Sequence, residues 1–292
     1  MLARRQTEYV SDRLRARWPE VEIEFVEVET RGDQITDRPL PEIGGKGLFT
    51  EALAEALRNT SIDFAVHSMK DLPTEETPGL AIGAVPDRAD PRDVFYAKSG
   101  RSLSAIAGGA VVGTSSVRRV AQVLMARSDL EIRAIRGNVP TRVRKVDDGM
   151  YDAVVLAAAG FVRLGMQHLV TQYLEISEFL PAPAQGALAV QCRSDDSRMM
   201  RLLAEIDDRD ARDATTAERT LLARLQAGCS SPVGAYALRK NGHVRMTAAV
   251  LARDGSSAVR VDGHDENPVA LGERLADSAL ERGATALIQD VR

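Results

Sequence analysis

The feature of this 292-residue sequence that most constrains its fold is the alternation of short apolar runs with segments of helical spacing. Residues 64–66, 110–112 and 151–159 have the length and composition of buried strands, and segments of helical spacing lie between these runs. Strands that alternate with helices are typical of a largely parallel sheet with helical crossovers. The sequence therefore predicts an α/β fold for most of the chain, divided into two or three domains.

Other segments extend this pattern toward the N-terminus. Apolar spacing predicts one helix over 7–17 and another that ends near Leu57, with an apolar face of Phe49, Leu53 and Leu57. Residues 21–28 alternate apolar side chains with Glu, which predicts a strand with one solvent-facing side.

The C-terminal part has a different character. A Pro-rich stretch at 181–186 reads as a hinge before a strand at 188–190. Beyond about residue 210 the sequence predicts a helix over 215–226, hairpin strands with turns at Asn241-Gly242 and Asp254-Gly255, and a final helix after Pro268. This pattern predicts a small α+β domain.

Composition excludes several classes of protein. With 44% hydrophobic and 27% charged residues the chain is an ordinary globular one, and the absence of an apolar run of signal-peptide or membrane-spanning length predicts a cytoplasmic protein without membrane contact. Cys192 and Cys229 are too few for a disulfide framework or a thiolate zinc site, and four scattered His residues predict no metal centre. A net charge of −4 argues against nucleic-acid binding.

Two motifs follow predicted strands, where open α/β sheets place their chemistry. Lys70 and Asp71 come directly after the strand at 64–66, although a lone Lys-Asp pair is also common in solvated turns. Ser116, Arg118 and Arg119 open a helix whose dipole disfavours cations, which indicates a bound anion; a Ser cap with two solvated arginines is the alternative. Nearby basic residues suggest further anion contacts at Arg136 and Arg142, whereas Arg127, Arg144 and Lys145 are expected to face solvent.

Two glycine-containing loops are also candidates. Residues 44–47 do not match a nucleotide P-loop, so Lys46 is either a charge beside a ligand or part of a structural turn. Cys229 lies in a Gly- and Ser-rich loop after a helix C-terminus, which should raise its pKa, so a permanent attachment fits this cysteine better than a catalytic thiolate. Cys192 is predicted to be a core residue.

These motifs together resemble the porphobilinogen deaminase (hydroxymethylbilane synthase) family over nearly the whole chain. The matching segments are GGKGLF (44–49), AVHSMKDLP (65–73), DPRD (90–93), GTSSVRR (113–119), RGNVPTR (136–142), LPAPAQGA (180–187) and GCSSPVG (228–234). The resemblance implies two lobes similar to type II periplasmic binding proteins plus a small C-terminal α+β domain. The domains would cover 1–86 with 187–205, 91–181 and 209–292.

The resemblance also implies an activity. Such enzymes join four porphobilinogen molecules, with loss of ammonia, onto a dipyrromethane cofactor that a thioether attaches to a cysteine, here Cys229, and then release hydroxymethylbilane by hydrolysis. Asp71, with Lys70, would be catalytic and would stabilise positive charge on the pyrroles. The remaining implied residues are Ser116, Arg118, Arg119, Arg136 and Gln185, with Lys70 and Asp71, for the cofactor, and Arg136, Arg142, Arg163 and Lys46 for the substrate. A cytoplasmic monomer is expected.

One departure concerns the N-terminus. Family members begin with a strand that ends in Thr-Arg-x-Ser-Pro-Leu-Ala. In this sequence Leu2-Ala3 matches the last two residues of that pattern, so the strand and the Arg and Ser of the pattern are missing. A late start or a truncation would explain the difference, and an inactive truncated member is one alternative. A non-catalytic two-lobed anion-binding protein is the other, but it would leave Cys229 and the third domain without a role.

Overall fold

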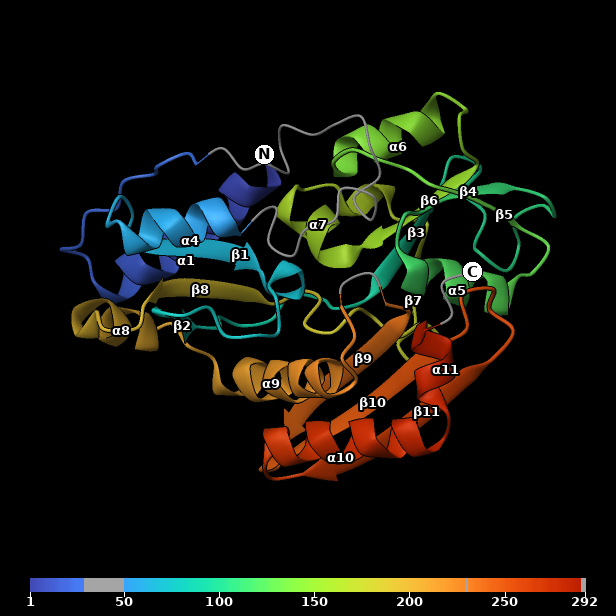
Figure 1. Ribbon diagram of the computed structural model, residues 1–292. Helices are drawn as coiled ribbons and strands as arrows, with labels where there is room; N and C mark the ends of the chain where they lie inside the picture. The colour runs from blue at the N-terminus through green and yellow to red at the C-terminus, as the bar shows by residue number, and fades with distance from the viewer. Residues whose placement is uncertain (29–49, 229–230, 290–292) are drawn as a thin grey trace. The chain divides into compact units, whose positions relative to one another are not determined.

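The computed structural model describes residues 1–28, 50–228 and 231–289 (Figure 1). The described residues form two compact units, the first from residues 3–88 and 187–212 and the second from residues 89–186 and 213–292. The α/β class is confirmed, and so is the α+β character of the C-terminal residues. The predicted boundaries of three domains stay a prediction.

The first unit contains a three-stranded sheet in the order β1-β8-β2. Val10 and Leu14 of α1 lie one helical turn apart and are both buried, in a core shared with Leu188 and Val190 of β8. The elements of this unit are α1 (Leu2–Arg17), α4 (Glu51–Arg58), β1 (Phe64–Ser68), the short 3-10 helix η1 (Met69–Asp71), β2 (Leu80–Ala84), β8 (Leu188–Arg193) and α8 (Ser197–Ala204).

The prediction of a strand over 21–28 is wrong, because the structure assigns these residues to no strand. Alternation divides side chains between two faces, but a strand also needs a neighbour for its backbone hydrogen bonds. Ile23 packs partly buried against the core, and its carbonyl accepts Arg15 Nη2 at 3.3 Å, while Phe25 and Val26 are exposed.

The prediction of a largely parallel sheet is also wrong for the described strands. Both pairings in the first unit are antiparallel, and the larger sheet of the second unit has two parallel and two antiparallel pairs. The order of strands and helices fixes a parallel direction only where a helix connects neighbouring strands. β8 instead returns from the second unit, more than a hundred residues after β1, so no crossover helix sets its direction.

The second unit contains a five-stranded sheet in the order β5-β4-β6-β3-β7. β4 runs parallel to β5 and β6, and each of these three strands leads into a helix: α5, α6 and α7 respectively. β3 is antiparallel to β6 and pairs its first residue, Asp93, with Ala157 at the end of β6. One edge of the sheet thus carries the carboxyl ends of β4, β5 and β6 and the start of β3. The elements are β3 (Asp93–Ala97), β4 (Val111–Gly113), α5 (Val117–Ala126), β5 (Glu131–Arg133), α6 (Val139–Asp147), β6 (Ala153–Ala157), α7 (Ala158–Arg163), η2 (Gln167–Leu169) and β7 (Gln172–Leu174).

The C-terminal part of this unit is an antiparallel sheet in the order β11-β10-β9 that packs against helices (Figure 1). Asn241 and Gly242 have φ values of +52° and +84°, which suits the two-residue turn between β9 and β10. The turn after β10 presses Gly255 onto α5, where a Cβ would lie 2.5 Å from the nitrogen of Met125, so only glycine fits. The elements are α9 (Arg209–Arg224), β9 (Val233–Lys240), β10 (His243–Leu251), β11 (Ala258–Asp265), α10 (Pro268–Glu281) and α11 (Ala284–Gln289).

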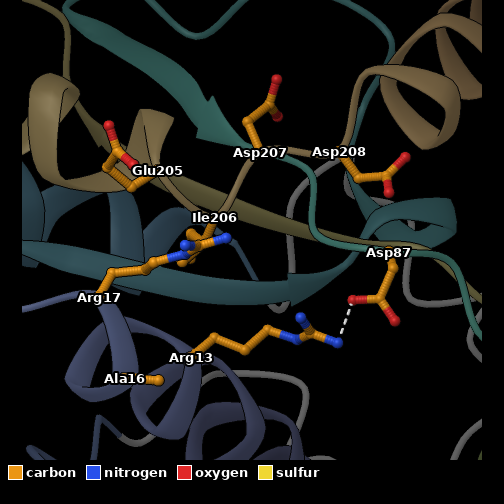
Figure 2. Close-up of a pocket in the computed structure, with 8 residues that line it drawn as sticks. All are labelled: Arg13, Ala16, Arg17, Asp87, Glu205, Ile206, Asp207 and Asp208. Carbon is orange, nitrogen blue, oxygen red and sulfur yellow. Dashed lines mark ion pairs between the residues drawn. The ribbon is translucent and has the colours of Figure 1, made fainter.

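A cavity of about 430 Å³ lies in the first unit, beside α1 and the segment between α8 and α9. Figure 2 shows its charged lining, in which Arg13 forms an ion pair with Asp87. Asp207 accepts the backbone nitrogen of Val85 and Arg212 Nε, each at 2.7 Å.

Among the described residues, no helix combines the length and the apolar character of a membrane span. In the same part of the chain, no group of three or more His, Cys, Asp or Glu side chains is arranged to hold a metal ion.

Candidate functional site

The candidate site begins where β4 and β5 end in the second unit. Ser115 Oγ donates to the carbonyl of Ile135 at 2.8 Å and accepts the nitrogen of Ile135 at 3.1 Å, so one hydroxyl joins the two loops. Ser116 is the half-buried cap residue of α5, and its nitrogen donates to Thr114 Oγ1 at 3.2 Å. These bonds fix the loop that presents the first turn of α5.

A buried carboxylate, Asp93, lies at the centre of this edge. Arg118 Nη1 donates to its Oδ2 at 2.7 Å, and Arg119 donates to its Oδ1 through Nη2 at 2.7 Å and Nε at 3.1 Å. Gln185 Nε2 donates to the same Oδ1 at 2.9 Å. All four side chains are buried, from 0% exposed for Asp93 to 6% for Arg119. The two arginines therefore have fixed positions.

This geometry changes the interpretation of the arginine pair. Neither arginine is solvated, and Asp93 supplies the anion that the sequence pattern called for. Arg118 Nη1 also donates to the carbonyl of Leu180 at 2.6 Å, and Arg119 Nη1 to that of Val155 at 3.2 Å. One carboxylate faces two guanidinium groups, so the cluster keeps a positive charge.

The ionisation of the cluster follows from its contacts. Burial acts to raise the pKa of Asp93, but the charges and hydrogen bonds of Arg118 and Arg119 outweigh it and hold that pKa well below its ordinary value. Burial lowers the pKa of Arg118, against the opposing effect of Asp93. Sequence reasoning did not assign a role to Asp93; the signal was an acidic residue that opens an otherwise apolar strand.

Arg136 and Arg142 add further positive charge. Arg136 Nη2 is buried and has no hydrogen-bond partner in the part of the chain that the structure describes. Arg142 Nε donates to the carbonyl of Gly137 at 2.6 Å. Burial, together with the neighbouring charges of Arg119 and Arg136, lowers the pKa of Arg142 to about 10. The structure thus brings these three guanidinium groups close enough to repel one another.

Arg163 lies at the end of α7, and its Nη2 donates to the carbonyl of Gly186 at 2.8 Å. That contact places it beside the segment that carries Gln185, whose Nε2 also donates to the carbonyl of Pro91 at 2.8 Å. Both predicted site residues are therefore attached to the backbone near the Asp93 cluster.

Lys70 and Asp71 belong to the first unit and form the 3-10 turn directly after β1. Lys70 is half-buried and Asp71 exposed. A side-chain hydrogen bond connects the end of β1 to α1: Gln6 Nε2 donates to Ser68 Oγ at 2.8 Å. His67 is 7% exposed, and burial lowers its pKa to about 4 against the opposing effect of a hydrogen bond with Gln191.

Two predicted site residues, Cys229 and Lys46, lie outside the described residues. Cys192 is fully buried in the core of the first unit, as predicted. A second buried carboxylate, Glu218 on α9, was not predicted, because in sequence it is one acidic residue on a charged helix.

Comparison with known proteins gives a consistent result. The chain matches the family models "Porphobilinogen deaminase, dipyromethane cofactor binding domain" over residues 1–201 and "Porphobilinogen deaminase, C-terminal domain" over residues 213–281. It is 43% identical to the porphobilinogen deaminase of Brevibacillus brevis, over 99% of this chain and 94% of that protein, and 47% identical to that of Desulforudis audaxviator, over 100% and 95%. Among solved structures it is similar to the VFT2 domain of Bordetella pertussis BvgS, with a TM-score of 0.39 and 15% identity over 68% of this chain and 76% of that one. The chain belongs to the porphobilinogen deaminase family.

Proposed function

We propose that the chain is a hydroxymethylbilane synthase of tetrapyrrole biosynthesis, which condenses four porphobilinogen molecules and releases the linear product by hydrolysis. In each condensation the C–N bond of one aminomethyl group breaks and ammonia leaves. The methylene carbon then bonds to a pyrrole carbon, which loses a proton. The observation that carries the proposal is the group of arginines at the sheet edge, of which Arg118 and Arg119 are buried with one carboxylate between them and Arg142 is half-buried beside them. Each porphobilinogen carries an acetate and a propionate, so a growing chain needs many such cations.

The same residues fit a dipyrromethane. A polycarboxylate would accept a hydrogen bond from the buried Nη2 of Arg136, which has no partner among the described residues, and would offset the mutual repulsion of the positive charges near Arg142. Guanidinium groups bind carboxylates in a fixed fork geometry. Arg118, Arg119 and Arg136, with Ser116 and Lys70, would hold the group, and Cys229 would attach it. When bound, it supplies the pyrrole to which the first substrate is joined. Gln185 contributes by holding Asp93 in place.

Asp71 is proposed to stabilise the positive charge that develops on the substrate as ammonia leaves, and to move protons at the reacting carbon. Its exposed position at the end of β1 suits a group that contacts a ligand. The ammonium of Lys70 would provide a hydrogen-bond donor beside it. Arg142, Arg163 and Lys46 are proposed to bind substrate carboxylates.

The intact mass of the purified protein tests this proposal together with porphobilinogen consumption. We expect a mass that exceeds the sequence by one dipyrromethane, ammonia release, and loss of both in Cys229→Ser. An unmodified mass without turnover would refute the proposal and favour a non-catalytic anion-binding protein. A cytoplasmic location and a monomeric state are part of the same proposal.

A further inference from the structure

A buried carboxylate on α9 has no part in the function proposed above. Glu218 is 0% exposed. Its Oε2 accepts the backbone nitrogen of Ala184 at 2.5 Å, and its Oε1 accepts that of Ala237, on β9, at 2.6 Å. Glu218 therefore connects the C-terminal sheet to the segment that precedes β8.

The backbone at Ala184 needs such a contact. Its φ of +61° lies in the left-handed region, which residues with a Cβ rarely adopt because the Cβ crowds the following carbonyl. A charge-assisted hydrogen bond from the nitrogen of this residue to a carboxylate favours the strained conformation. Gly186, two residues later, is confined by the carbonyl of Ala89, which a Cβ at position 186 would approach to 2.5 Å.

Gln185 lies between these two constrained positions, so they set the direction of its side chain. Its Nε2 reaches Asp93 Oδ1 at 2.9 Å and the carbonyl of Pro91 at 2.8 Å. Asp93 in turn orients Arg118 and Arg119. A change in the backbone at position 184 would move Gln185 away from Asp93 and loosen the arginine pair.

We propose that Glu218 is a positioning residue for the arginine pair: it holds Ala184 in the left-handed conformation, which aims Gln185 at Asp93. The inference rests on the proposed function, because it assumes that Arg118 and Arg119 bind carboxylates of the dipyrromethane and of the substrate units joined to it. It gives the C-terminal part of the second unit a role in binding these carboxylates that is separate from the covalent attachment at Cys229.

Glu218→Gln is the direct test. A carboxylate accepts at both oxygens, whereas an amide accepts at one atom and presents an NH2 group to the other backbone N–H. We expect the variant to lower kcat/KM for porphobilinogen by about tenfold, mainly through KM, because contacts to carboxylates that do not react are lost in the ground state and the transition state alike.

Two further variants separate positioning from general destabilisation. Asp213 lies on α9 with Glu218 and forms an ion pair with Arg239 of β9, and it makes none of the contacts to residue 184 described above. Asp213→Asn removes this ion pair and should leave kcat/KM unchanged. Glu218→Gln combined with Ala184→Gly should recover most of the lost kcat/KM, since glycine adopts a positive φ without the steric cost.

Hydrogen exchange of the peptide that covers 182–187 supplies a readout independent of turnover. Faster exchange is expected in Glu218→Gln and not in Asp213→Asn. The inference is overturned if Glu218→Gln keeps kcat/KM within twofold of the parent, if glycine at 184 gives no recovery, or if exchange of this peptide is unchanged. A parent protein that lacks the adduct and does not consume porphobilinogen would instead refute the proposed function, while the exchange comparison would still test the contact.

Discussion

Replacing Asp93 by Asn should destabilise the second unit strongly. The variant keeps the shape of the side chain but removes the one charge that compensates Arg118 and Arg119, both less than 10% exposed. Breaking a buried ion pair from one side costs about 3–5 kcal/mol, a large part of a typical unfolding free energy of about 5–15 kcal/mol. With a urea dependence of about 2 kcal/mol per molar, the midpoint of unfolding should fall by about 2 M.

The assay must report on the second unit. Trp18, the single tryptophan, belongs to the first unit, whereas Tyr96, Tyr151, Tyr173 and Tyr236 belong to the second, so tyrosine near-UV circular dichroism is the suitable signal.

The matched control is Asp129→Asn, which removes a carboxylate that Arg127 contacts at the surface and should leave the midpoint unchanged. Acid provides a second check. The folded pKa of Asp93 lies below its unfolded value of about 3.9. Its contribution to the free energy of unfolding is therefore complete above about pH 3.9 and is lost as the pH falls toward the folded pKa. Asp93→Asn should lack this part of the acid sensitivity. A midpoint shift below about 0.5 M, or unchanged acid sensitivity, would refute the reasoning.

Three other predictions can be checked with the same protein. Asp71→Asn should lower kcat by about a hundredfold or more with an unchanged urea midpoint, because the side chain is exposed and its proposed role is electrostatic; full activity would overturn the assignment. Arg142→Met should raise KM for porphobilinogen by about tenfold. Because the variant also removes the repulsion between residue 142 and its arginine neighbours, an added anion has less positive charge to offset, and pyrophosphate should stabilise the variant less than the parent. Equal stabilisation would contradict the role of Arg142 in anion binding. His67 has a folded pKa of about 4 against 6.5 unfolded, so stability of the first unit should fall by up to about 3 kcal/mol as the pH drops from 6.5 to 4, and His67→Gln should flatten that slope; an unchanged slope would show that another group titrates.

Local patterns predicted much of the fold because they depend on neighbours in sequence. The final helix after Pro268, the buried strand at 151–159 and the Asn241-Gly242 turn are all found, within a few residues. Strand direction and pairing depend on distant segments, so the sequence misassigned 21–28 as a strand and the sheet as largely parallel. The family itself was identified correctly from its motifs.

The candidate site shows the same division. Arg118 and Arg119 were predicted to contact an anion because cations near a helix start are unusual, and the structure places Asp93 between them. Asp93 and Glu218 were missed as partners, since an acidic residue has the same appearance in sequence whether it faces solvent or a buried guanidinium. Their contacts join residues 19 to 92 positions apart, a separation that periodicity does not report.

The position of Gly255 has a consequence for the order of events during synthesis. This residue closes over the backbone of α5 about 130 positions after the arginine pair has been made, and Glu218 also emerges late. At about 5–20 residues per second, a ribosome needs roughly seven to twenty-six seconds to cover that distance. During this interval α5 and its arginine pair are present but the C-terminal residues that pack on α5 are not, so the nascent chain carries an unfinished interior. Chaperone binding to stalled chains of 200 and 270 residues would reveal this interval, with the shorter chain retained more strongly.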